Sequence, residues 1–279
     1  MTAPSPRPAQ GSVSQVSLWQ GGGASVRGTS HRRTDKPNQD AFACRPEGGA
    51  AQRMLLAVSD GHGSAPSFRS DVGAKLAVES ALDVLDWFFD DADIFEATTR
   101  MAQDIVSAWR QKVDAHKSAN PLPSGQDTRS YLPYGATLIC AGVTAELFIA
   151  VQIGDGDLLL GYGDGRIEKP IPDDDGLVGE QTYSLCLDDA AQAARYYILE
   201  RDGHTAWPDF IFLSTDGIAK SFATDDDYRS VGDSYRSIAH TDFAAAIEGA
   251  PAWLEDVTAK GSGDDVTMCF AARKEGGGT

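Results

Sequence analysis

The feature that most constrains the fold is a short apolar run that ends abruptly in an aspartate set between small residues. Residues 54–58 are apolar throughout, and the sequence Ser-Asp-Gly-His-Gly follows at 59–63. A run of about five apolar residues bounded by glycine is typical of a buried strand, which here delivers Asp60 to its end. The glycines beside His62 let a cation or a substrate approach the backbone closely. Taken alone, however, the segment would more often be an ordinary Asp-Gly turn.

The same pattern recurs along the chain, and this recurrence favours a site over a turn. Four further acids stand at the ends of apolar runs: Asp155 after 147–153, Asp216 after 211–215, Asp40 before 41–44 and Asp264 before 266–270. Neighbouring antiparallel strands run in opposite directions. An acid that precedes one strand therefore lies at the same end of the sheet as an acid that follows the neighbouring strand. We therefore expect all five carboxylates to converge.

Converging carboxylates need cations. They repel one another and raise each other's pKa values unless positive charge neutralises them. The available donors are oxygen atoms, with no Cys or His at metal-ligand spacing, which favours Mg²⁺ or Mn²⁺ over zinc. Two such ions about 3.5–4 Å apart are a common device for displacement at phosphorus, because they activate a water molecule and neutralise the phosphoryl oxygens.

The composition allows one large domain and argues against two classes of partner. A chain of 279 residues, 42% of them hydrophobic, can bury a substantial core. We expect a disordered leader at 1–12, a single catalytic domain at 13–273 and a flexible tail at 274–279. The net charge of −17 argues against nucleic acid and against an anionic membrane as partners.

The cysteines and the N-terminal residues predict a cytoplasmic protein. The four cysteines are far apart and form no CxxC pair, as expected for reduced, buried thiols. Prolines within the first ten residues interrupt the region where a signal peptide needs an apolar core. The longest apolar zone, 137–154, contains Gly142 and Glu146, so two strands explain it better than a membrane span.

The order of the predicted elements indicates the fold class. The first elements expected are a strand at 14–19 broken by glycines 21–23, a polar basic loop at 28–33 and helices at 66–89 and 95–113. A loop at 120–134 and strands to 213, which include a hairpin at 158–168, follow. Short helices at 225–239 and 242–254 and a last strand at 266–270 complete the order. The irregular stretch 170–183 is either a substrate-selecting lid or an ordinary surface loop. Strands with helices grouped between them predict an α+β fold, in which two packed, mainly antiparallel sheets are flanked by helices.

Six motifs in this order resemble the metal-dependent protein phosphatase family, the type 2C serine/threonine phosphatases, and most of all its bacterial branch. They are Asn-Gln-Asp-Ala at 38–41, Asp-Gly-His-Gly at 60–63, Gly-Ala-Thr at 135–137, Gly-Asp-Gly-Asp at 154–157, Ser-Thr-Asp-Gly at 214–217 and Gly-Asp-Asp-Val-Thr at 263–267. The resemblance covers residues from about 28 to 271, nearly the whole chain. Each motif is weak by itself, whereas six in sequence are a strong signal.

The resemblance implies an αββα sandwich and a serine/threonine phosphatase in which a metal-bridging hydroxide attacks phosphorus directly. It implies that Asp60 bridges two ions, Mn²⁺ or Mg²⁺, with Asp40 and the Gly61 carbonyl on one, and Asp216 and Asp264 on the other. Asp155 would join Asp216 in holding a weaker third ion. His62 would be the general acid that protonates the leaving alkoxide. Phosphorylated proteins are the implied partners, first of all a serine/threonine kinase and its substrates.

The chain also departs from the family pattern. Gln39 stands where many relatives have an acid, and Asp35 stands where the usual phosphate-binding arginine is expected. Arg32 and Arg33 are nearby alternatives for binding phosphate, although a solvated loop explains them equally well. An alternative function is a phosphatase-fold adaptor that recognises phosphoproteins or a kinase without hydrolysing phosphate. Retention of all the metal-binding acids argues against that alternative.

Overall fold

Two antiparallel sheets packed face to face form the centre of the molecule in the computed structural model, which describes residues 17–90, 94–172 and 182–274. In spatial order the first sheet comprises β3 (Ala50–Ala51), β1 (Leu18–Val26), β11 (Val266–Lys274), β10 (Phe210–Ser214), β7 (Asp157–Gly161) and β8 (Ile167–Glu168). The second comprises β2 (Ala41–Arg45), β4 (Met54–Ser59), β5 (Leu138–Val143), β6 (Leu147–Ile153) and β9 (Arg195–Glu200).

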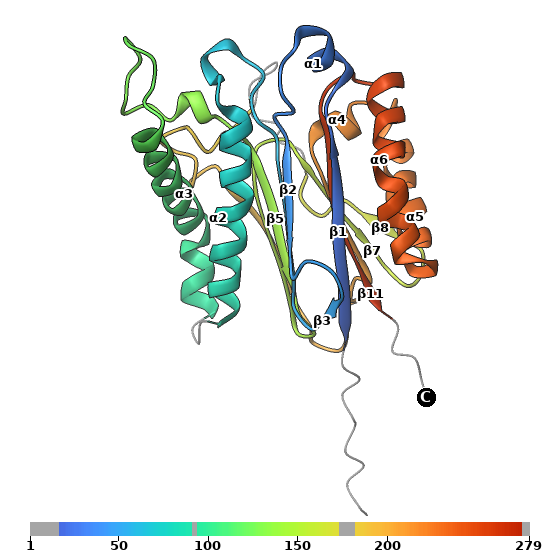
Figure 1. Ribbon diagram of the computed structural model, residues 1–279. Coiled ribbons are helices and arrows are strands. Elements are labelled where there is room, and N and C mark those ends of the chain that lie inside the picture. Colours follow the sequence, from blue (N-terminus) through green and yellow to red (C-terminus); the bar gives the residue numbers. More distant parts are fainter. Residues whose placement is uncertain (1–16, 91–93, 173–181, 275–279) are drawn as a thin grey trace, which may run out of the picture.

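Helices cover both outer faces of this pair of sheets (Figure 1). The long helices α2 (Ser70–Asp90) and α3 (Ile94–Ala119) pack on the second sheet, and α5 (Asp225–Thr241) and α6 (Phe243–Lys260) pack on the first. The short elements are α1 (Thr29–Thr34), α4 (Asp216–Ala219) and the 3₁₀ turns η1 (Ala65–Ser67) and η2 (Leu132–Tyr134). The predicted α+β class, with two mainly antiparallel sheets flanked by helices, is confirmed.

The apolar strands lie between two layers of core, which explains why their sequences do not alternate with polar residues. Successive side chains of a strand point to opposite faces of the sheet. In β4, Leu55 and Ala57 face the core beneath α2 and α3, whereas Met54, Leu56 and Val58 face the core between the sheets. Both faces are therefore dry, and β4 is the buried strand that its sequence predicts.

The predicted break at glycines 21–23 is wrong, because β1 runs through them from Leu18 to Val26. The glycines are needed for close packing. A Cβ atom at Gly21 would lie 2.5 Å from Sδ of Met54, and one at Gly23 would overlap the backbone oxygen of Met268. Their lack of a side chain lets the neighbouring layers approach β1.

Other boundaries also differ from the prediction. Residues 28–33 were expected to form a loop, whereas most of them form α1, and Pro66 lies in η1 ahead of α2. The last strand continues through Lys274, the first residue of the predicted tail. The predicted leader at 1–12, most of the stretch 170–183 and the tail beyond 274 lie outside the described residues. No helix in the described ranges is long and apolar enough to cross a membrane.

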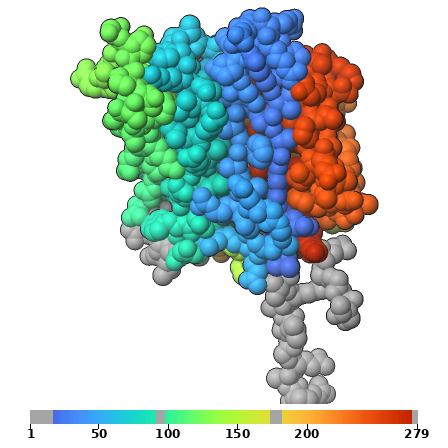
Figure 2. Space-filling model, viewed as in Figure 1, coloured from blue at the N-terminus to red at the C-terminus, as the bar shows by residue number. Residues whose placement is uncertain are grey.

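In the space-filling view, the α2–α3 pair and the α5–α6 pair enclose the N-terminal strands from two sides (Figure 2). The helices α1 and α4 lie at the same end of the sandwich (Figure 1). That end also holds the end of β4 and the beginning of β2, since Ala41 is opposite Ser59 in their antiparallel register.

Candidate functional site

Strand register brings the predicted acids to one end of the sandwich. Asp40 directly precedes Ala41 of β2, and Asp60 directly follows Ser59 of β4, the residue opposite Ala41 in the antiparallel register. In the other sheet, β10 pairs antiparallel with β11, so the end of β10 that leads into Asp216 adjoins the start of β11 that follows Asp264. The Thr215 hydroxyl donates a 2.7 Å hydrogen bond to Oδ2 of Asp40 and thereby joins the two sheets at this end.

Asp40 is buried, with 5% of its surface exposed. Burial raises the pKa of its carboxyl group well above the ordinary value, and the charges of Asp265 and Asp216 raise it further, although the hydrogen bond from Thr215 opposes the shift. Its backbone N–H donates to Oδ1 of Asn38 at 3.0 Å, which fixes the turn that leads into β2.

Asp60 lies at the centre of the charge cluster. Burial raises its pKa well above the ordinary value, and the charges of Asp40, Asp216 and Asp264 add to the effect in that order. Its backbone N–H donates to the hydroxyl of Thr137 at 3.1 Å, and its carbonyl accepts from the Thr137 N–H at 2.8 Å. The carboxylate of Asp60 is therefore held on a rigid backbone among three other acids.

Asp155 and Asp264 stand at the border of the cluster. Both pKa values are raised, first by loss of water around the carboxylate and also by the charge of Asp216. Asp155 is exposed and Asp264 half-exposed, in contrast to the buried Asp40 and Asp216. All five predicted acids are thus brought within electrostatic reach of Asp216 or Asp60.

Asp216 opens α4, and its two carboxylate oxygens differ in surroundings. Oδ2 accepts a hydrogen bond from the ammonium group of Lys220, one turn later on the same segment. Oδ1 is buried and has no hydrogen-bond partner. An unpaired, buried carboxylate oxygen is costly unless something else binds it.

Gly61 lies where the chain can accept only glycine. A Cβ atom there would lie 2.6 Å from the backbone oxygen of Gln39 and 2.7 Å from that of Ser70. The Gly61 N–H donates to the same Gln39 oxygen at 3.1 Å. This packing fixes the backbone immediately after Asp60.

His62 is half-buried beside the acids. Its backbone N–H donates to the Gly135 carbonyl at 3.0 Å, and its ring packs so close to Gly135 that a Cβ atom there would lie 2.6 Å from Cδ2. Burial lowers the pKa of His62, although the negative charge of Asp216 acts in the opposite direction. A lowered pKa makes the imidazolium a stronger acid but leaves less of it protonated at neutral pH.

The two arginines predicted to bind phosphate are not brought to the acids. Arg32 on α1 forms a 2.6 Å ion pair with Glu255 on α6, and Arg33 donates from Nε to the Thr29 carbonyl at 3.2 Å. Both side chains are exposed. Asp35 ends α1 with a left-handed backbone conformation, φ 55°, and lies 3.5 Å from Arg27.

Sequence reasoning missed the role of Asp265, which holds together the loops that surround the site. Its Oδ1 accepts the Gly28 N–H at 2.6 Å, while Oδ2 accepts the Gln39 N–H at 2.7 Å and lies 2.8 Å from Nδ1 of His31. The side chain is 3% exposed. The only sequence signal was the acid doublet before the last strand, which does not say which acid points inward.

A second missed residue is Lys36, whose ammonium group donates to the Gly63 carbonyl at 2.7 Å. This bond clamps the glycine turn after His62 to the segment between α1 and β2. An exposed lysine in a polar loop carries no sequence signal that distinguishes it from an ordinary solvated side chain.

The donor chemistry fits divalent cations. The converging side chains offer carboxylate oxygens, burial and mutual repulsion raise the pKa values of Asp60 and Asp155, and Oδ1 of Asp216 lacks a partner. Within the described ranges, no three His, Cys, Asp or Glu side chains are arranged so that they could hold a metal ion as they stand.

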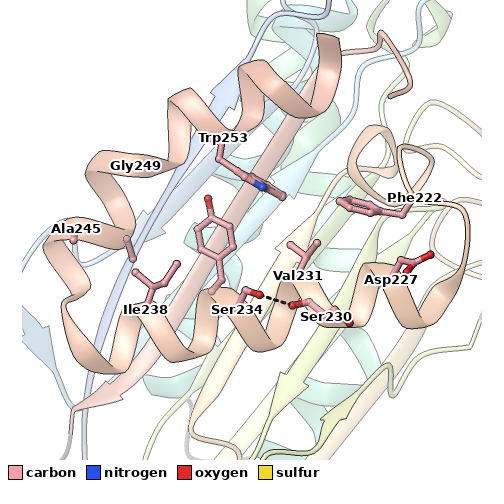
Figure 3. Close-up of a pocket in the computed structure, with 11 residues that line it drawn as sticks. Phe222, Asp227, Ser230, Val231, Ser234, Ile238, Ala245, Gly249 and Trp253 are labelled. Carbon is pink, nitrogen blue, oxygen red and sulfur yellow. Dashed lines mark hydrogen bonds between the residues drawn. The ribbon is translucent and has the colours of Figure 1, made fainter. Parts of the chain in front are cut away.

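An open, mostly apolar groove of about 520 Å³ lies elsewhere, between α5 and α6 (Figure 3). Val231 and Ile238 of α5 face Gly249 and Trp253 of α6 across it, and Phe222 closes one end. Ser234 donates to the backbone oxygen of Ser230 along the floor. None of the five predicted acids lines this groove.

Comparison with known proteins defines the family. The profile of Protein phosphatase 2C matches residues 27–257, and the chain belongs to this family. This confirms the resemblance that the six motifs indicated. It also confirms that the chain belongs to an enzyme family of protein phosphatases. A search of the curated proteins finds no match.

Solved bacterial phosphatases share the fold. PppA, a regulatory component of T6SS in Pseudomonas aeruginosa, is 18% identical with a TM-score of 0.62, over 92% of this chain and 99% of that one. The catalytic domain of the serine/threonine phosphatase PstP, in complex with two manganese ions, is 18% identical with a TM-score of 0.57, over 93% of this chain and all of that one. The PstP structure from Mycobacterium tuberculosis is 17% identical with the same TM-score, over 92% of this chain and 100% of that one.

Proposed function

We propose that this protein hydrolyses phosphoserine and phosphothreonine in other proteins with the help of divalent metal ions. The observation that carries the proposal is the position of Asp60, whose carboxylate is surrounded by the charges of Asp40, Asp216 and Asp264. Such a group of acids is unfavourable without cations, and its oxygen donors suit Mg²⁺ or Mn²⁺. The two manganese ions in the similar PstP structure support the choice of metal.

The proposed division of labour follows the positions of the acids. Asp60 would bridge two ions, Asp40 and the Gly61 carbonyl would complete one site, Asp216 and Asp264 the other, and Asp155 would share a weaker third ion with Asp216. Bound divalent ions would supply an activated water molecule and neutralise charge on the phosphoryl oxygens.

The remaining roles belong to the protein's own side chains. His62 would deliver a proton to the leaving serine or threonine oxygen, and its half-buried position beside the acids supports that role. Arg33 and Arg32 remain the proposed phosphate-binding residues, and Arg33 must turn away from the Thr29 carbonyl to act. Burial by substrate would strengthen such a guanidinium–phosphate contact.

The proposal includes the biological setting. The partners would be phosphorylated proteins, chiefly a serine/threonine kinase and its substrates, and the enzyme would act in the cytoplasm. All four cysteines are free thiols, which supports a reducing compartment.

The test is release of inorganic phosphate from a phosphothreonine peptide in Mn²⁺, with and without a chelator. We expect activity that the chelator abolishes and that Asp60→Asn removes while circular dichroism shows an intact fold. Asp164→Asn is the matched control, because Asp164 lies in an exposed turn between two glycines and forms an exposed ion pair with Arg166, two residues later. Near wild-type activity in folded Asp60→Asn would refute the metal assignment.

The adaptor alternative gives a different result in the same experiment. An adaptor would bind the phosphothreonine peptide, measurable by fluorescence anisotropy, in preference to the unphosphorylated peptide. It would release no phosphate at any Mn²⁺ concentration.

A further inference from the structure

The side chain of Lys220 extends back from the end of α4 over the acid cluster. Lys220 is the C-terminal cap of that short helix, and its N–H donates to the Asp216 carbonyl at 2.8 Å. Its ammonium group bonds Oδ2 of Asp216, a residue whose side chain is 11% exposed, while the Lys220 side chain itself is 61% exposed. The lysine therefore approaches a buried acid from the solvent side.

The charge of Lys220 acts on several of the proposed metal ligands together. It opposes the rise in the pKa of Asp155, and burial, which would lower the pKa of Lys220, is outweighed by Asp216, Asp155 and Asp60. Two other basic side chains of this end of the molecule have partners elsewhere, Lys36 on the Gly63 carbonyl and Arg32 on Glu255.

We propose that Lys220 is a built-in counter-ion that competes with divalent metal for Asp216 and thereby sets the metal affinity of the site. The inference rests on the proposed function, since it assumes that Asp216 binds metal. With the ammonium group on Oδ2 and with Oδ1 unpartnered, an ion that uses both oxygens must displace Lys220 or share Oδ2 with its positive charge. An ion that uses Oδ1 alone is repelled by a positive charge a few ångströms away. Either route weakens metal binding.

Lys220→Met tests the idea, because methionine keeps most of the apolar stem and removes the charge. Titration calorimetry with Mn²⁺, without substrate, measures metal affinity independently of activity. We expect the Kd for Mn²⁺ to fall about tenfold in Lys220→Met, and this difference to shrink at high salt. Lys220→Arg retains the charge and should bind Mn²⁺ like the wild type.

Lys260→Met is the matched control, since Lys260 pairs with Asp256 one turn earlier in α6 and both side chains are exposed. It should leave the Kd unchanged. Equal or weaker Mn²⁺ binding by folded Lys220→Met would overturn the role of Lys220 and leave the phosphatase proposal intact. Failure of both the wild type and Lys220→Met to bind Mn²⁺ would overturn the two proposals together.

Discussion

The ion pair between Asp209 and Arg236 should supply a pH-dependent part of the stability of the fold. Asp209 precedes β10, and its carboxylate accepts two hydrogen bonds of 2.7 Å from Arg236 on α5. Nε2 of His240 lies 3.4 Å from the same carboxylate. Asp209 therefore anchors α5 to the sheet whose end carries Asp216.

The magnitude follows from the pKa of Asp209. Burial alone would raise that pKa, but Arg236 and His240 hold it at about 2, compared with an ordinary value of 3.8. At 1.36 kcal/mol for each pKa unit, the difference corresponds to about 2.4 kcal/mol of stability. Because the pKa is lower in the folded state, this contribution is complete above about pH 5 and is lost as the pH falls through 3.8 toward 2. About half of it remains at pH 3.

Asp209→Asn removes the charge with little change in shape. We expect it to lower the free energy of unfolding by about 2–3 kcal/mol at pH 7 and by about half as much at pH 3, in urea titrations that leave the m-value unchanged. The control Asp256→Asn breaks only the exposed pair with Lys260 and should cost less than about 0.5 kcal/mol. An equal loss for Asp209→Asn at both pH values would refute the electrostatic argument.

Three further predictions concern glycine positions and His62. Gly249 faces the α5–α6 groove with open space around it, so Gly249→Ala should stabilise α6 by about 0.5–1 kcal/mol and raise Tm by about 2 °C. Gly73→Ala, also within a helix, should instead lower the free energy of unfolding by about 1–3 kcal/mol, because the alanine Cβ would overlap the Tyr134 carbonyl. A similar Tm for the two glycine variants would contradict this contrast. His62→Gln should lower kcat on a phosphothreonine peptide by about 10²-fold or more and far less on an activated aryl phosphate, with Mn²⁺ affinity nearly unchanged. Equal losses on both substrates would mean that His62 supports the turn instead of donating a proton.

The sequence was sufficient to place the acids because strand ends depend on local patterns. An apolar run followed by an acid and glycine marks where a strand ends, and antiparallel pairing then decides which ends meet. Asp40 and Asp60 flank one pair of strands for this reason. The long amphipathic helices α2 and α3 were also predictable, since each has its own apolar face.

Features that depend on a distant partner could not be predicted. Glycines 21–23 look like a strand break until Met54 and Met268 are known to lie against them. Likewise, nothing in the sequence around Arg32 indicates its ion pair with Glu255, which lies on a helix more than two hundred residues later. In both cases the deciding atom comes from another layer of the fold.

The acid doublet before β11 shows how two adjacent residues can have different chemical roles. Asp264 and Asp265 both lie beside His31, at 3.9 and 2.8 Å from its ring nitrogens, yet they differ in burial. Asp264 remains half-exposed beside the acid cluster, whereas Asp265 is buried and accepts the N–H groups of Gly28 and Gln39. The loop that carries Gln39 leads directly into Asp40. The neighbour of one proposed metal ligand therefore fixes the backbone of another, and the two sheets are joined at the point where the proposed chemistry requires their carboxylates to meet.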